Sequence, residues 1–131
     1  MRHAPAFPGQ AGFALLEALI SILLFSIGVL GIVALQARAS QFSVDSEDRS
    51  RAALLANQIV SQMWAHKSTS LDADTISTWQ AQVSASGSGL PSGNGSVSVD
   101  NGLATVTITW KAPWRNSTEQ SNSYVTRVVV P

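Results

Sequence analysis

The chain has 131 residues, of which 45% are hydrophobic and 12% are charged, with eight basic side chains, eight acidic side chains and no cysteine. An ordinary soluble domain carries roughly 25% charged residues, so this chain is short of charge. Its length allows one domain with an appended segment and excludes a large two-domain enzyme. The zero net charge gives no basic surface for nucleic acid, so no nucleic-acid partner is expected. The lack of cysteine excludes disulfide bonds, thiolate metal sites and cysteine nucleophiles.

The N-terminal part combines a short polar segment with a long apolar one. Residues 1–12 contain two prolines, two glycines and one arginine, which predicts an extended, exposed segment. Residues 18–37 contain no charged side chain. About 20 uncharged, mainly apolar residues can cross the ~30 Å core of a bilayer as a helix. A secretory signal peptide has a shorter apolar region after a basic stretch. Because this run follows the acidic Glu17, a membrane anchor is favoured.

One long helix is predicted from residue 13 to residue 66, because this segment contains no proline and only two glycines. Over residues 38–67, apolar side chains recur three and four positions apart, which predicts an amphipathic helix with one buried stripe. Acidic and basic residues one turn apart support the helix, either as a solvated face or as contacts with a neighbouring subunit. The stripe comprises Phe42, Ala52, Leu55, Ala56, Ile59, Val60, Met63 and Trp64, and the charge pairs are Asp45–Arg49 and Glu47–Arg51.

A second helix and a linker are predicted before the strands. Residues 71–83 carry apolar side chains at helical spacing after the possible caps Asp72 and Asp74, which predicts a short helix. Residues 84–96 consist mainly of serine and glycine, which predicts a flexible linker.

Alternating apolar and polar residues predict strands in the C-terminal segment 97–131. The first strand ends in the turn sequence Asp100-Asn101-Gly102, which suits a hairpin. We therefore expect an α+β fold, in which a long N-terminal helix packs on a small antiparallel sheet of about three to four strands.

Side chains that could carry chemistry are few. The two histidines, His3 and His66, are far apart in the sequence, and no metal-ligand, nucleophile or phosphate-loop motif occurs. No enzyme, metal site or cofactor is therefore expected. Trp64, Trp79 and Trp110 fall on apolar stripes and are predicted to lie in the core.

Glu17 is the residue that carries most information about function. An ionisable side chain in a membrane-spanning helix costs roughly 2.5–3.5 kcal/mol at the bilayer centre and less near the interface, so it indicates a function with a partner. The alternative is a glutamate at the membrane interface, favoured by the positive end of the helix dipole. The residues around Glu17 favour the first interpretation.

A short motif at residues 12–17, GFALLE, resembles the processing motif of type IV prepilins, with glycine before the cleaved bond, phenylalanine after it and glutamate as fifth residue of the mature chain. The resemblance implies cleavage between Gly12 and Phe13 by the membrane-embedded prepilin peptidase, followed by N-methylation of Phe13. Glycine suits the cleaved position because it lets a protease approach the backbone closely. Ala14 replaces the threonine or serine that is common directly after the phenylalanine, but the motif can still be recognised.

The same resemblance implies that Glu17 acts in subunit assembly. Cleavage gives Phe13 a free ammonium group inside the hydrocarbon of a helix bundle, where unpaired charge is costly. The Glu17 carboxylate of a neighbouring subunit can neutralise this ammonium group and so set the stagger of one helix against the next.

Two further regions resemble the PilV type of minor pilin, also called type IV pilus modification proteins. The run SIGVLGIVALQ at residues 26–36 is similar to the IGxLGxxxLQ run of that type, and the strands at 106–110 and 124–130 are similar to its C-terminal sheet. Gly28 and Gly31 are either weak points that let the helix stretch or small residues for close helix packing. Many pilins close a C-terminal loop with a disulfide, which this chain cannot form.

The resemblance therefore implies a minor pilin with a prepilin leader at 1–12, a transmembrane and assembly helix at 13–37 and a periplasmic head at 38–131. The precursor would cross the bacterial inner membrane once, with the leader in the cytoplasm, before it joins a type IV pilus on the cell surface. There it would support pilus biogenesis, adhesion and twitching motility from the priming complex or the tip.

The partners implied are prepilin peptidase, other minor pilins, the major pilin, the inner membrane and, as a further candidate, a tip adhesin. Trp114, in a predicted loop, is the candidate partner contact, because aromatic side chains dominate interface energetics. The second candidate function is a minor pseudopilin of a type II secretion system. A single-span membrane-anchored periplasmic binding protein is the less favoured alternative.

Overall fold

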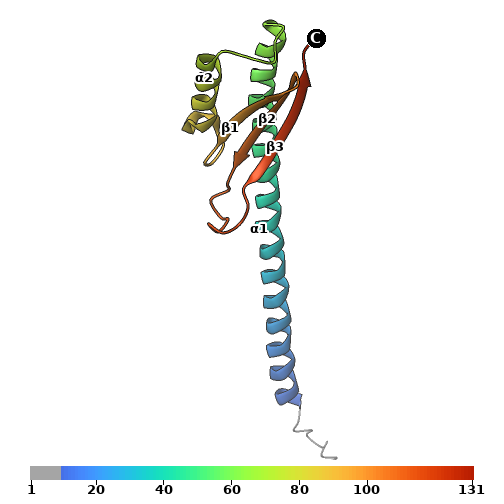
Figure 1. Ribbon diagram of the computed structural model, residues 1–131. Helices are drawn as coiled ribbons and strands as arrows, with labels where there is room; N and C mark the ends of the chain where they lie inside the picture. Colours follow the sequence, from blue (N-terminus) through green and yellow to red (C-terminus); the bar gives the residue numbers. More distant parts are fainter. Residues whose placement is uncertain (1–9) are drawn as a thin grey trace, which may run out of the picture. The chain divides into compact units, whose positions relative to one another are not determined.

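The computed structural model describes residues 10–131 and has the expected α+β fold. Two helices, α1 and α2, precede the three strands of one antiparallel sheet (Figure 1). The chain divides into two compact units, Met1–Phe42 and Ser43–Pro131, and α1 contributes to both. The elements are α1 Gln10–Ala65, α2 Ala73–Ser84, a single 3₁₀ turn η1 Ser86–Ser88, β1 Asn94–Asp100, β2 Leu103–Trp110 and β3 Asn122–Val129.

In the first unit, α1 begins three residues before Phe13. Residues 10–12 are therefore helical, although composition predicts an extended segment over 1–12; residues 1–9 lie outside the described part of the chain. The helix can extend this far because no proline lies between Pro8 and Pro91 and because glutamine and alanine favour helix. All side chains of residues 12–42 are exposed, so no other part of residues 10–131 buries the apolar surface of this segment.

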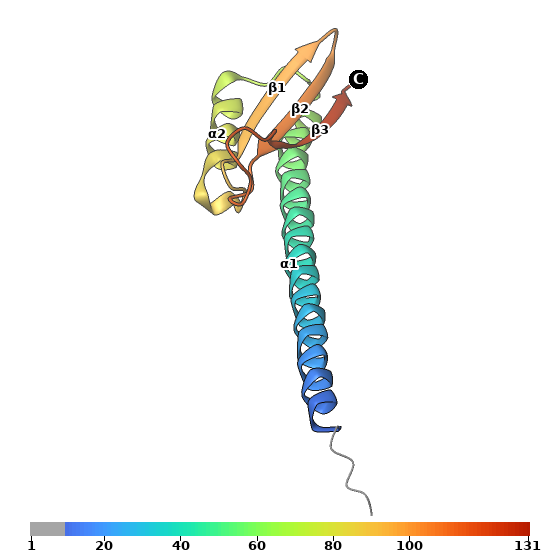
Figure 2. The same cartoon turned by 90° about the horizontal axis from the view of Figure 1, so that it is seen from below.

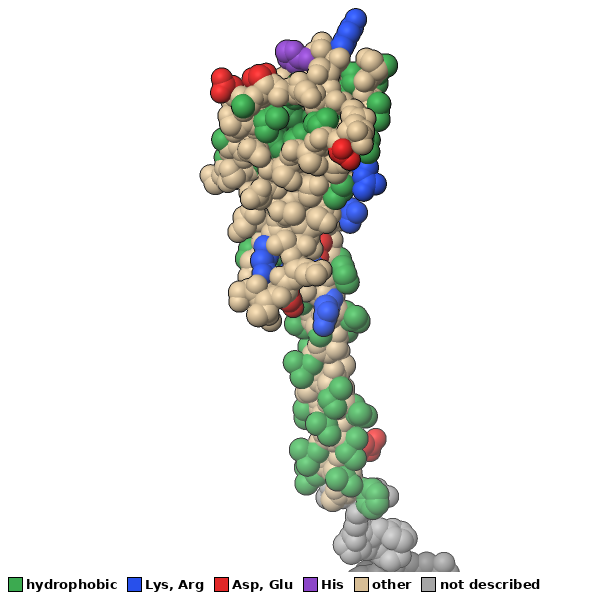
Figure 3. Space-filling model, in the orientation of Figure 1, with side chains coloured by type: hydrophobic (Ala, Val, Ile, Leu, Met, Phe, Trp, Pro, Cys, Tyr) green, Lys and Arg blue, Asp and Glu red, His purple; other side chains and the backbone are tan. Residues whose placement is uncertain are grey.

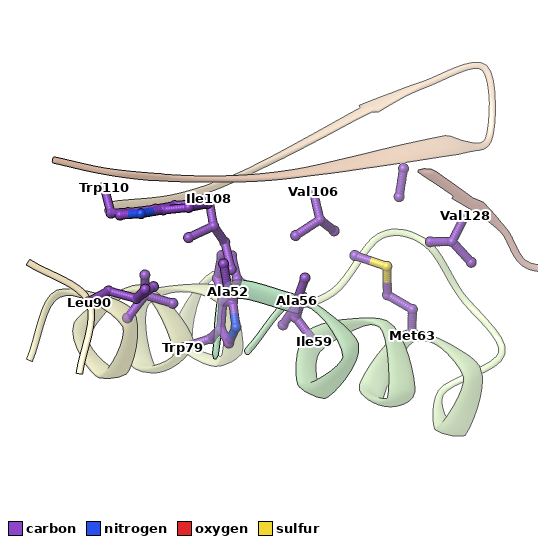
Figure 4. Close-up of a cluster of buried hydrophobic side chains, with 12 residues drawn as sticks. Ala52, Ala56, Ile59, Met63, Trp79, Leu90, Val106, Ile108, Trp110 and Val128 are labelled. Carbon is purple, nitrogen blue, oxygen red and sulfur yellow. The ribbon is translucent and has the colours of Figure 1, made fainter. Parts of the chain in front are cut away.

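In the second unit, the later part of α1 packs on one face of the sheet (Figures 1 and 2). The core side chains of α1 point at the sheet in Figure 4 and confirm the predicted stripe between Ala52 and Met63: Ala52, Ala56, Ile59 and Met63. The prediction for Phe42 is wrong, because this residue is exposed and belongs to the first unit. Every second residue of β2 is buried in the same core, as the alternation predicts: Ala104, Val106, Ile108 and Trp110. Full burial of one such large apolar side chain contributes roughly 1.5–3 kcal/mol, so this core is the main support of the unit.

The sheet has the strand order β1-β2-β3, and both strand pairs are antiparallel. A hairpin joins β1 and β2 and is closed by Asp100 opposite Leu103. Asn101 and Gly102, between them, have φ angles of 50° and 79°. Positive φ at both central residues defines a type I′ turn, for which Asn-Gly is a preferred sequence. The predicted turn and the three predicted strands are confirmed.

The short helix α2 is also confirmed. Asp72 caps it, because its side chain accepts a hydrogen bond from the Thr75 amide at 2.9 Å. Trp79 of α2 is buried, and its indole Nε1 donates to the Leu55 carbonyl of α1 at 2.8 Å. This hydrogen bond and the burial of the ring fix α2 against the later part of α1.

The segment predicted as a Gly/Ser linker, 84–96, differs from that expectation. It contains the end of α2, the 3₁₀ turn and the start of β1 at Asn94. Leu90 joins the core, and Gly95 is buried against Trp79. At Gly95 a small residue is required because the Trp79 ring approaches the backbone closely, a cause that composition alone does not reveal.

Two of the three tryptophans predicted in the core are buried, Trp79 and Trp110, but the prediction for Trp64 is wrong because it is 51% exposed. A helix turns about 100° per residue. Trp64, directly after Met63, therefore lies beside the buried stripe and outside its contact with the sheet.

Replacing Gly95 by alanine is expected to lower the free energy of unfolding by about 1–3 kcal/mol, the usual cost of overpacking. A Cβ at this position would lie 2.7 Å from two ring atoms of Trp79, Cη2 and Cζ3. Urea unfolding of the full chain in detergent, followed by near-UV circular dichroism, measures the change. Ser96→Ala, an exposed position next to it in β1, is the matched control and should change stability by less than about 0.5 kcal/mol. Equal stability of Gly95→Ala and the wild type would contradict this packing.

Candidate functional site

The predicted processing motif, residues 12–17, begins in the first turn of α1. The bond between Gly12 and Phe13 belongs to the first four residues of the helix, whose amides have no acceptor within it. Unwinding this turn therefore breaks few hydrogen bonds. An ideal Cβ on Gly12 would meet no atom within 4 Å, and the Phe13 side chain is exposed. The geometry thus leaves the bond open to a protease.

Glu17 lies one helical turn after Phe13, on the same side of α1. Its side chain is exposed, and it is the only charged residue between residues 13 and 37. In a membrane, an isolated carboxylate among apolar side chains needs a cation as partner. Cleavage after Gly12 would create such a cation, because the backbone nitrogen of Phe13 would become an ammonium group. The helix therefore brings the predicted assembly residue close to the predicted modification site.

The segment after Glu17 has the length and composition to cross a membrane. An 18-residue window of α1 reaches a mean hydropathy of 2.7, and none of it is buried within the chain. On the face shown in Figure 3, apolar side chains cover this part of the helix. An apolar surface of this extent marks a site of contact with lipid or with other proteins. A bilayer or a bundle of neighbouring helices can supply that contact.

Gly28 and Gly31 lie within this apolar segment. The helix is continuous through both, and no atom lies within 4 Å of an ideal Cβ on either glycine. Both positions are therefore free to receive a neighbouring helix, and both lower the helix propensity locally. Their roles in packing or in stretching stay predictions.

A buried acidic residue, Asp48, was not predicted. It is 4% exposed, and its Oδ2 has no hydrogen-bond partner among the described residues. Burial, and then the negative charge of Asp45, raise the pKa of Asp48. The sequence did contain a signal, because Asp48 precedes Ala52 by four residues and so continues the buried stripe one turn toward the N-terminus.

Near this end of the stripe, a cavity of about 200 Å³ lies between α1 and the ends of β2 and β3. Asp45 and Trp110 line it, and each has a buried polar atom without a hydrogen-bond partner, Oδ1 and Nε1. Of the two predicted charge pairs, Glu47–Arg51 forms. Asp45 and Arg49 line the cavity without an ion pair among the described residues. The remaining lining residues are Asn122 and Ser123.

Trp114 lies in the loop between β2 and β3 and is 43% exposed, so it is available for contact. The Lys111 ammonium donates to the carbonyls of Ser117 at 2.8 Å and Glu119 at 3.0 Å. These bonds close the loop in a chain that has no cysteine for a disulfide. The partner contact of Trp114 stays a prediction.

Among residues 10–131, no three histidine, aspartate or glutamate side chains gather into a group that could hold a metal ion. The described side chains that stand out are therefore those of the processing segment and of the buried acidic end of the stripe.

Residues 8–33 match the family model of the prokaryotic N-terminal methylation motif. The match supports a protein of the type IV pilin family. It includes Gly12, Phe13, Glu17 and both helix glycines, and it implies processing by prepilin peptidase and assembly with other pilins. Together with the apolar helix it fits a membrane-anchored pilin, and it suggests a structural role rather than catalysis. No curated protein and no solved structure matches the chain.

Asp48→Asn is expected to raise the melting temperature at pH 7. The pKa of Asp48 is raised in the folded chain above its ordinary value of 3.8, so the ionised carboxylate destabilises the fold. The protonated, neutral carboxyl group stabilises the folded chain, and this stabilisation is fully present at pH values below the unfolded pKa. It is lost as the pH rises through the folded pKa. Asparagine is uncharged at every pH, so the variant does not lose stability in this way as the pH rises.

Thermal unfolding between about pH 3 and pH 7 tests this prediction, since the variant and the wild type should differ more at the upper end. Asp100→Asn, an exposed residue at the end of β1, is the control and is expected to melt like the wild type throughout. A lower melting temperature of Asp48→Asn at pH 7 would show that the carboxylate stabilises the fold.

Proposed function

We propose that this protein is a minor pilin of the PilV type, a type IV pilus modification protein. The observation that carries the proposal is the GFALLE motif at residues 12–17, which begins an exposed apolar helix long enough to cross a membrane. The methylation-motif match over residues 8–33 supports it. The run at residues 26–36 supports the PilV type in particular, through its resemblance to that type.

In this proposal, residues 1–12 are a cytoplasmic leader, residues 13–37 span the inner membrane and residues 38–131 form the periplasmic head. Prepilin peptidase cleaves after Gly12, and Phe13 is then methylated. The subunit passes from the membrane into the priming complex or the tip of the pilus, beside other minor pilins and the major pilin. Both environments accept the same helix, because lipid and a helix bundle each remove its apolar side chains from water.

The loop that carries Trp114 is proposed as a contact for another minor pilin or for a tip adhesin. The Lys111 hydrogen bonds support this role, because they order the loop before binding and so reduce the entropy that binding costs. Through such contacts the protein supports pilus biogenesis, adhesion and motility.

Mass spectrometry of the protein from intact cells tests the processing. The mature chain is expected to begin at Phe13 and to carry one N-methyl group. Gly12→Val should block cleavage, because a branched side chain hinders the approach of the peptidase to the backbone. Gly31→Ala, in the same helix beyond the motif, is the control that should be cleaved normally. A wild-type chain that keeps its leader would contradict the pilin proposal and favour a single-span membrane-anchored periplasmic binding protein.

Glu17→Ala is expected to be cleaved normally but to enter sheared pili about tenfold less, because it leaves the Phe13 ammonium group unpaired in an apolar bundle. Immunoblots of the membrane and pilus fractions measure the two quantities separately. Asp74→Ala removes an exposed acidic side chain from α2, outside the apolar segment, and should assemble normally. Normal incorporation of Glu17→Ala would refute the proposed charge pairing.

A minor pseudopilin of a type II secretion system is the second candidate, because a methylation motif suits its processing equally well. Deletion of the gene distinguishes the two functions. Loss of surface pili with normal protein export supports the pilin, whereas loss of export with normal pili supports the pseudopilin.

A further inference from the structure

The two edges of the sheet differ in what covers them. β1 forms one edge, and α2 packs beside it in both views (Figures 1 and 2). The side-chain amide of Gln80, on α2, donates to the Gly95 carbonyl of β1 at 2.9 Å. The protein therefore covers this edge with its own helix and satisfies part of its backbone.

β3 forms the other edge and pairs only with β2. Among residues 10–131, no backbone hydrogen bond outside that ladder involves β3. In Figures 1 and 2, no other element runs along the outer side of β3. Half of the amides and carbonyls of this strand therefore have no partner within the second unit.

The register shows which groups these are. The closing pair of a two-residue hairpin, here Asp100 and Leu103, is hydrogen-bonded, so the backbone groups of Leu103 point at β1 and those of Ala104 point at β3. Ala104 faces Val128, so the even-numbered residues of β3 bond to β2. The residues with outward amides and carbonyls are Ser123, Val125, Arg127 and Val129.

This edge lacks the usual protection against pairing. β3 has eight residues and contains no proline and no lysine. Val125 and Val129 are 49% and 59% exposed, and Arg127 lies between them on the same face. Natural proteins blunt an edge strand with charges, prolines, bulges or a covering element, because an open ladder pairs with other chains. Within β3, the charged side chain of Arg127 is the only one of these protective features.

We infer that β3 binds an extended strand of another polypeptide, which continues the sheet beyond β3. The backbone selects this occupant, because only an extended chain offers amides and carbonyls at the spacing of the open ladder. The side chains select its sequence: an acidic residue is expected opposite Arg127, with apolar residues opposite Val125 and Val129.

The occupant differs from a second copy of β3. β3 contains no acidic residue, so a second copy cannot supply the charge opposite Arg127. The strand Asn94–Asp100 of a second copy does contain an acidic residue, but α2 packs beside that strand and Gln80 already occupies the outward carbonyl of Gly95. We therefore assign the strand to a different subunit of the same fibre, an assignment that rests on the proposed function.

Photocrosslinking in cells that contain the whole assembly tests the inference. A benzophenone amino acid at Val129 is expected to crosslink to one segment of a different protein, a segment that contains an acidic residue between apolar ones. The control is the same label at Ser98, which lies on the same face of the sheet in β1 and should give only background.

Val125→Pro should reduce the Val129 crosslink about tenfold, because proline removes an outward donor and blocks the approach of a strand. Val125→Ala keeps the amide and should retain the crosslink.

Arg127→Glu provides a second test that leaves the backbone intact. It should also reduce the crosslink about tenfold, through repulsion of the acidic residue, whereas Arg127→Lys should retain it. Near-UV circular dichroism checks the fold of each variant, and Arg127→Glu decides the question if Val125→Pro does not fold. Background crosslinking at Val129, crosslinking to a second copy of the chain, or unchanged crosslinking in the folded variants would overturn the inference. Methylation of Phe13 is measured separately, so failure here is distinguishable from failure of the proposed function.

Discussion

The contact between one face of α1 and one face of β2 supports the other elements of the second unit. A helix repeats every 3.6 residues and a strand every two, so each must place its apolar residues on its own period for the two faces to meet. Small and large side chains complement each other across this contact. Ala52 lies near the rings of Trp79 and Trp110, whereas the longer Met63 reaches toward Val128 (Figure 4). α2 and the 84–96 segment are ordered because Trp79 and Leu90 complete this core.

The same helix meets a different constraint before residue 43. There its apolar segment, residues 18–35, contains no charged side chain and contributes to no core among the described residues, so its burial must come from a bilayer or from other chains. This division explains part of the low charge of the chain, because half of α1 is adapted to lipid or to other helices; the rest reflects the many serine and threonine residues of the C-terminal part. One continuous helix can serve both constraints since helix formation requires only the absence of proline and adequate propensity, whereas burial depends on which faces are apolar.

The sequence correctly predicted the elements whose formation depends on residues close together in the chain. The amphipathic stripe, the Asp72 cap, the Asn101-Gly102 turn and the alternation along β2 each depend on a few neighbouring residues, and the structure agrees with them. The roles of Leu90 and Gly95 depend on Trp79, which arrives from another element, so composition suggested a linker instead. Asp48 could have been found by extending the stripe one turn. Gly12, Phe13 and Glu17 were found through a motif, and the structure adds their exposure and their place on one helix, whereas their roles depend on proteins outside this chain.

Three features of the protein lack partners among the described residues, and they differ in physical kind. The apolar surface of α1 requires other apolar surface to bury it, and the Glu17 carboxylate requires a group of opposite charge. The outward amides and carbonyls of β3 require hydrogen-bond partners. Hydrophobic burial is the largest of these energies but is not directional, so it would hold helices together without fixing their relative height. A single charge pair in a low-dielectric bundle can fix that height, because a shift by one turn leaves both charges unpaired. A backbone ladder fixes the register between two heads, because a slip by one residue turns every side chain to the opposite face of the sheet. In the proposed fibre, attraction, stagger and orientation would thus be determined by three separate parts of one short chain.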